Sequence, residues 1–129
     1  MDFHAFLNAA SERGKDANTL WESGRHPGAL YMIGYQVECT LKAHLQQQSK
    51  PFPTSGAGGH DLRSLWEAAG LRLSDLQGPK RYFMDMWTTA LRYRRLTDEE
   101  ERNIQVLRQG ALELVRYINT RQRRWRQRR

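Results

Sequence analysis

The chain has 129 residues, of which 39% are hydrophobic, and it carries a formal net charge of +7. This length allows one domain with a single core and is too short for two. No apolar run is long enough to span a membrane, and the first residues lack the pattern of a signal peptide. With one cysteine, Cys39, no internal disulfide can form, so we expect a cytoplasmic protein whose thiol is packed rather than reactive.

Most of the net charge lies at the C-terminus. Six of the 21 basic residues fall in the last nine positions, RQRRWRQRR, which contain no acid. The remaining 120 residues are nearly neutral, with 15 basic and 14 acidic side chains. We therefore divide the chain into a globular part, residues 1–120, and an arginine-rich tail, residues 121–129.

Helical periodicity dominates the sequence, and no segment alternates convincingly with period two. Apolar residues at three- and four-residue steps predict a first helix that follows Asp2, a suitable capping residue, and extends to Trp21. A short breaker then leads into a central amphipathic helix over residues 27–45, where Pro27 suits the first turn. Because the link is short, we expect these two helices to be antiparallel neighbours.

Gly34 lies in the middle of the predicted central helix. A glycine in a helix interior costs about 1 kcal/mol relative to alanine. It is easiest to explain if another backbone passes close to it. We therefore expect the central helix to be surrounded by the other segments of the chain.

The next segment has a different character. Residues 46–59 lose all periodicity and contain two prolines and three glycines, which predicts a mobile surface loop. A short helix follows over residues 61–69 and stops at Gly70. Helical spacing then returns over residues 80–94.

The last helix has a clear start signal. Thr97 can cap it while Glu100, three residues further on, reaches back to the backbone. Apolar residues at helical spacing continue as far as Ile118. Together, the segments predict an all-α protein, an antiparallel bundle of four main helices plus one short helix.

Two charged residues of the central helix are candidates for a functional site. Glu38 and Lys42 are four residues apart, in the orientation that favours an ion pair. One interpretation is an ordinary surface pair. The other is a partly buried pair that orients Tyr31 and Tyr35 beside a groove. His60 has the same ambiguity, because it can be a plain loop residue or part of a site.

The sequence offers no sign of a metal or a cofactor. The four histidines do not form a metal-ligand pair with Cys39 or with carboxylates at helical spacing. The glycines near residue 58 lack the lysine and hydroxyl residue of a phosphate-binding loop. We expect neither a metal nor a cofactor.

Three segments of the chain resemble the HEPN domain. They are GYQVECTLK at residues 34–42, GHDL at residues 59–62 and WTTALRY at residues 87–93. The resemblance implies an antiparallel helical bundle that commonly forms a homodimer, with a functional cleft where the protomers meet. It also implies a prokaryotic toxin–antitoxin or defence system, with an antitoxin or a small nucleotidyltransferase as partner.

Many HEPN proteins are metal-independent RNases that use an arginine followed, after four to six residues, by a histidine. Here the positions reached from Arg92 are Thr97, Asp98 and Glu99, so this histidine is missing. We therefore expect a HEPN scaffold that binds RNA, a nucleotide or a partner protein without cutting RNA. The alternative is a divergent endoribonuclease in which His60 supplies the acid–base function. Its composite catalytic site would contain Glu38, Lys42, His60, Arg92 and Tyr93.

The tail favours a nucleic-acid partner. Its arginines can follow phosphates while the tryptophan stacks on a base, although a solvated terminus is the plain alternative. It has too few apolar residues to lie on a membrane surface. The expected nucleic-acid-binding residues are Arg121, Arg123, Arg124, Trp125, Arg126, Arg128 and Arg129.

Overall fold

The computed structural model describes residues 2–53 and 61–128, and these residues form helices and no strands. The α-helices are α1 (Phe3–Glu22), α2 (His26–Gln47), α3 (Leu62–Ala68), α4 (Gly78–Met86), α5 (Asp98–Arg102) and α6 (Ile104–Gln127), with short 3-10 helices η2 (Leu73–Asp75) and η3 (Thr89–Tyr93). The predicted all-α class is confirmed. Within the described ranges, no helix combines the length and apolar character needed to cross a membrane.

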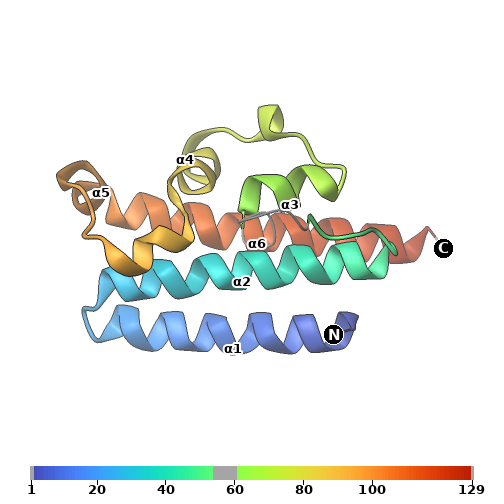
Figure 1. The fold of residues 1–129 in the computed structure, drawn as a ribbon, viewed down its shortest axis with the longest axis horizontal. Helices are drawn as coiled ribbons and strands as arrows, with labels where there is room; N and C mark the ends of the chain where they lie inside the picture. Colours follow the sequence, from blue (N-terminus) through green and yellow to red (C-terminus); the bar gives the residue numbers. More distant parts are fainter. Residues whose placement is uncertain (1, 54–60, 129) are drawn as a thin grey trace.

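The three long helices α1, α2 and α6 lie lengthwise, and the shorter α3, α4 and α5 lie along one side of them (Figure 1). Helix α1 runs antiparallel to α2 as predicted, but α6 runs in the same direction as α2 (Figure 1). The side-chain amide of Gln122, near the end of α6, donates to the carbonyl of Thr40 in the second half of α2 at 3.2 Å. The expectation of an antiparallel arrangement is therefore wrong for α2 and α6.

Helix α2 forms the centre of the core. Its apolar face is buried against α1, α3, η3 and α6. The predicted stripe is fully covered and consists of Leu30, Ile33, Val37, Leu41 and Leu45. The predicted caps are also present, since the Asp2 carboxylate accepts from the Ala5 amide at 2.8 Å and Pro27 lies in the first turn of α2.

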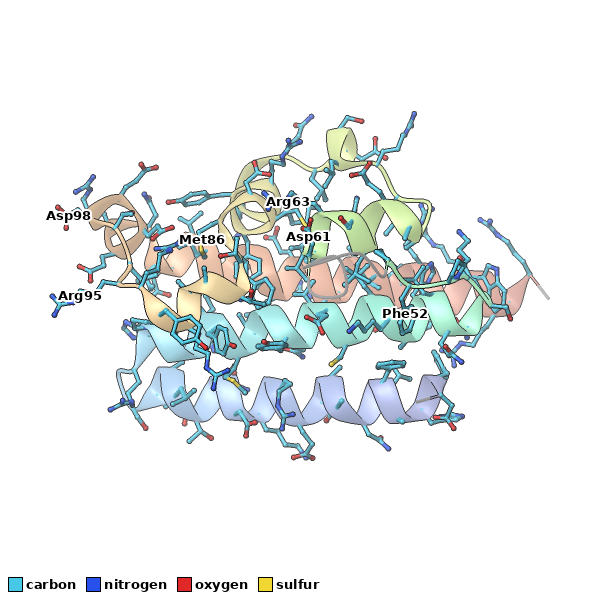
Figure 2. All side chains as sticks on the ribbon, viewed as in Figure 1. Phe52, Asp61, Arg63, Met86, Arg95 and Asp98 are labelled. Atoms are coloured by element: carbon cyan, nitrogen blue, oxygen red, sulfur yellow. The ribbon has the colours of Figure 1, made fainter. Side chains whose placement is uncertain are left out.

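The predicted short helix over residues 61–69 is present as α3, with Asp61 and Ala69 as its capping residues. The Asp61 carboxylate accepts from the Arg63 amide at 3.1 Å and caps the helix. Figure 2 shows these two side chains at the start of α3. Gly70, with a φ of +81°, ends it. Of the predicted loop, residues 54–60 lie outside the described part of the chain, and Gln46 and Gln47 still belong to α2.

The expected helix over residues 80–94 is wrong in its second half. The chain leaves α4 at Trp87, which has extended backbone angles (φ −74°, ψ 127°), and resumes as the 3-10 helix η3. The Trp87 indole nitrogen donates to the carbonyl of Tyr31 at 3.3 Å. A β-carbon on Gly34 would overlap this indole ring. Position 34 must therefore be glycine because the Trp87 side chain packs against it, and not because another backbone passes close by as expected.

The capping box before the last helices is confirmed. The Thr97 hydroxyl accepts from the Glu100 amide at 3.1 Å, and the Glu100 carboxylate accepts from the Thr97 amide at 2.8 Å. Arg94 adds two hydrogen bonds, of 2.8 and 3.1 Å, to the same carboxylate and lowers its pKa. A turn at Asn103 separates α5 from α6, so the predicted single helix is divided there.

Helix α4 crosses α6 at Gly110. A β-carbon at this position would overlap the backbone carbonyl of Pro79, so the two backbones touch here. Glycine is needed because it alone lets a neighbouring backbone approach a helix this closely. This contact places Lys80, the next residue of α4, beside the C-terminal half of α6.

Candidate nucleic-acid interface

Helix α6 continues into the arginine-rich segment without interruption. It runs to Gln127, so residues 121–127 are helical, and Gln122 is buried against α2. Because a helix repeats every 3.6 residues, the arginines of this segment point to different sides. Arg121 and Arg124 lie on one face, together with Trp125 and Arg128, and line one pocket.

A hollow of about 410 Å³ follows this side of α6. The residues that line this hollow are Lys80, Glu113, Arg116, Tyr117, Thr120, Arg121 and Arg124, and we call the surface that they form the α6 basic face. The Lys80 ammonium lies 5.5 Å, and the Arg121 guanidinium 5.9 Å, from the centre of the Tyr117 ring. Both cations therefore lie over the Tyr117 ring, whose centre is 5.6 Å from that of Trp66, and this cluster of cations suits phosphate binding.

A second pocket, of about 270 Å³, adjoins this face at the end of the bundle. We call it the His44 pocket, and it is lined by His44, Gln48, Lys50, Ala69, Gly70, Arg121, Arg124, Trp125 and Arg128. It lies between the C-terminal end of α2, the turn after α3 and the last turns of α6. Arg121 and Arg124 line both hollows and make them one continuous basic surface.

The remaining tail arginines lie elsewhere. The Arg126 guanidinium lies 5.8 Å from the centre of the Phe3 ring, on the α1 side of α6. Arg123 donates to the Thr120 hydroxyl at 3.4 Å, next to its own helix. Arg129 lies outside the described residues. The tail therefore does not present all its predicted contacts on one surface.

His44 is the most perturbed titratable group of this surface. Its side chain is buried, and its Nδ1 has no hydrogen-bond partner among the described residues. Burial, together with the positive charges of Lys50 and Arg121, lowers the pKa of His44 to about 4. The imidazole is therefore neutral at physiological pH, with one nitrogen that donates and one that accepts.

This shifted pKa predicts a loss of stability in acid. Between pH 6.5 and 4 the unfolded chain binds a proton at His44 and the folded chain does not, so the free energy of unfolding falls as the pH falls. The full effect is about 3 kcal/mol. Urea unfolding of the wild type and of His44→Leu at several pH values should show their stability difference changing across this window. A difference that stays constant with pH would contradict the prediction.

Arg92 and Tyr93 lie at the other end of the bundle. They line an open groove of about 440 Å³, the Arg92 groove, together with Tyr31, Tyr35, Thr89 and Ala90. The hydroxyls of Tyr31 and Tyr35 are 3.0 Å apart. Burial and the Tyr31 hydroxyl raise the pKa of Tyr35, and Arg92 opposes this shift. Tyr35 is therefore protonated at neutral pH and is not a general base.

Glu38 and Lys42 form the buried pair and not the surface pair. The Lys42 ammonium lies 3.0 Å from the Glu38 carboxylate, and their side chains are 14% and 5% exposed. Neither residue lines the Arg92 groove. The Glu38 charge nevertheless contributes to the raised pKa of Tyr35. The structure thus places Arg92, Tyr93, Tyr31 and Tyr35 together, with the ion pair behind them in the core.

His60 lies outside the described residues, so its place in a composite site stays a prediction. In the part of the chain that the structure describes, no group of three or more His, Cys, Asp or Glu residues could hold a metal ion. Cys39 is half-buried, and burial raises the pKa of its thiol, as expected of a packed cysteine.

Comparison with family models, with curated proteins and with solved structures gives no match to this chain.

Sequence reasoning missed four residues that line the basic surface: His44, Lys50, Lys80 and Arg116. A signal for His44 existed, because it continues the buried spacing of Val37 and Leu41 one turn further along α2. No local pattern could have identified Lys50 or Lys80, since each reaches α6 through tertiary packing.

Proposed function

We propose that this protein is a HEPN-type helical protein that binds single-stranded RNA without cutting it. The observation that carries the proposal is the continuous basic surface along the C-terminal half of α6. Its cations are Lys50, Lys80, Arg116, Arg121, Arg124 and Arg128. Among the described residues, Glu113 is the only acid that lines either hollow. Such a one-sided cluster matches a phosphate backbone.

The dimensions of the surface support a single strand as ligand. From Arg116 to Arg128 a helix rises about 18 Å, enough to follow several phosphates. Trp125 lies among the cations and lines the His44 pocket, where an unpaired base can stack on an aromatic side chain. In an RNA duplex the bases are already stacked, so this side chain favours single-stranded RNA.

The HEPN resemblance of residues 34–42, 59–62 and 87–93 supports the wider setting. On its basis we infer a homodimer that acts with RNA in a prokaryotic defence or toxin–antitoxin system. An antitoxin or a small nucleotidyltransferase would be its protein partner. Tyr93 is 83% exposed beside Arg92 and offers an aromatic surface that a second protomer can cover.

A second candidate is a divergent metal-independent RNase centred on the Arg92 groove. The observation that favours it is the pairing of Arg92 with three tyrosines in one open groove. An arginine there can stabilise the charge that grows on a scissile phosphate. Two features favour binding over cleavage. The histidine is missing at positions 97–99, and Tyr35 has a raised pKa that prevents it from acting as a base.

One experiment separates the two functions. The purified protein is mixed with a fluorescently labelled single-stranded RNA in EDTA. Anisotropy then measures binding, and a denaturing gel measures cleavage. We expect bound and intact RNA, with an affinity that falls steeply between about 50 and 200 mM salt. RNA that stays unbound at the low salt concentration would overturn the proposal. Cleavage by the wild type that is lost in Arg92→Ala would instead establish the RNase.

A further inference from the structure

The His44 pocket gathers four cations, and the stability of the helices around it does not require all four to lie together. Lys50, Arg121, Arg124 and Arg128 line it, and none of its lining residues in the described part of the chain carries a carboxylate. Among the described residues, none of these four cations forms an ion pair. The C-terminus of α6 favours cations in its last turn, which accounts for Arg124 and Arg128. This preference does not explain why Lys50, which follows the end of α2, lines the same pocket as the arginines of α6.

A second, independent observation comes from His44 itself. The residue is 3% exposed and lines the pocket, and its Nδ1 has no hydrogen-bond partner among the described residues. The side-chain oxygen of Gln48, which lines the same pocket, is likewise buried without a partner. A buried polar atom without a partner costs about 1–3 kcal/mol. The buried His44 nitrogen beside this cluster of cations can donate to an anionic ligand, whereas the Gln48 oxygen can only accept and would need a donor on another part of that ligand.

We propose that the His44 pocket binds a phosphate monoester, the group carried by a free mononucleotide or by the 5′ end of an RNA. A monoester carries a charge of about −1.5 to −2 at neutral pH, whereas an internal phosphodiester carries only one. Its terminal oxygens can accept forked hydrogen bonds from Arg121 and Arg124, and one from the His44 imidazole. The four cations therefore match the monoester better than an internal phosphate.

The pocket also has a place for the base. Trp125 lines it beside Arg124 and Arg128, so a nucleobase next to the bound phosphate can stack on the indole. Along the α6 basic face, Arg121 and Arg124 lead directly out of the pocket. An RNA whose 5′ phosphate occupies the pocket can continue along this face. For an RNA end the inference thus rests on the proposed function, whereas for a mononucleotide it does not.

The experiment compares ligands that differ only in the phosphate. Calorimetry measures the binding of AMP and of adenosine, and anisotropy measures the same RNA with a 5′ phosphate or a 5′ hydroxyl. Lys50→Gln removes a cation found only in the His44 pocket, and Lys80→Gln, on the α6 basic face alone, is its matched control. We expect at least about tenfold tighter binding of the phosphorylated ligand by the wild type and by Lys80→Gln. Lys50→Gln should lose most of this preference.

The outcomes distinguish this inference from the proposed function. Equal binding of both RNAs, with neither AMP nor adenosine bound, would overturn the phosphate pocket and leave RNA binding intact. AMP binding that Lys50→Gln removes, without RNA binding, would establish a mononucleotide site and overturn the proposed function. A preference for phosphate that Lys50→Gln leaves unchanged would overturn the placement of the site.

Discussion

Replacing Arg121 and Arg124 together by glutamine should weaken the binding of single-stranded RNA by about 100-fold. Both residues line the α6 basic face and the His44 pocket, so the double variant interrupts the surface at its middle. A hydrogen bond to a charged group contributes about 1.5–3 kcal/mol, and two such losses reach this factor. Anisotropy titrations at several salt concentrations should also give a salt slope that is smaller by about 1.4.

The matched control removes two charges from the opposite end of the bundle. Arg95 and Arg102 are both exposed and lie near α5, far from the C-terminal end of α6 (Figures 1 and 2). Their double replacement by glutamine changes the net charge equally and should weaken binding less than about threefold. An equal loss in the two double variants would show that RNA does not bind specifically along α6. Circular dichroism should show that both variants remain helical.

Gly110→Ala should lower the free energy of unfolding by about 2 kcal/mol. The new β-carbon would overlap the Pro79 carbonyl, so α4 must move away from α6. Overpacking typically costs about 1–3 kcal/mol, and a backbone neighbour cannot relax as a flexible side chain does. The higher helix propensity of alanine offsets only about 1 kcal/mol. Urea unfolding monitored by circular dichroism measures the change.

A suitable control lies in α2. A β-carbon at Gly28 would meet a Leu20 methyl group at 3.5 Å, an ordinary van der Waals contact. Gly28→Ala should therefore leave stability unchanged or raise it by up to about 1 kcal/mol. If Gly110→Ala were as stable as Gly28→Ala, the backbone contact between α4 and α6 would be absent in solution. Moving α4 would also displace Lys80, so Gly110→Ala should disturb the basic face as well.

The starts of α1, α3 and α5 were predictable because capping is local. Asp2, Asp61 and Thr97 each accept a hydrogen bond from an amide two or three residues ahead, and sequence spacing alone reveals such a pattern. The segment after α4 was not predictable in this way. Residues 87–93 have helical spacing, yet Trp87 leaves the helix to reach Gly34 and the Tyr31 carbonyl on α2. A contact across more than 50 residues outweighs local propensity here.

The candidate site likewise contains residues that the sequence points to and residues that only tertiary packing brings together. The arginines themselves are evident in the sequence, which was divided there into a globular part and a tail. Arg121, Arg124 and Arg128 share one face only because α6 continues to Gln127. The other lining residues, which complete the pocket beside these arginines, could not be predicted from the sequence. His44 and Lys50 come from the end of α2, and they meet α6 only because the two helices run in the same direction (Figure 1).

The amino-acid sequence is thus sufficient for the helical class and for the capped starts of α1, α3 and α5, since each depends on residues within about one turn of one another. The direction of α6 relative to α2, the break at Trp87 and the meeting of His44 with the arginines depend on packing between distant segments. Side-chain burial selects one arrangement from several that share the same local pattern.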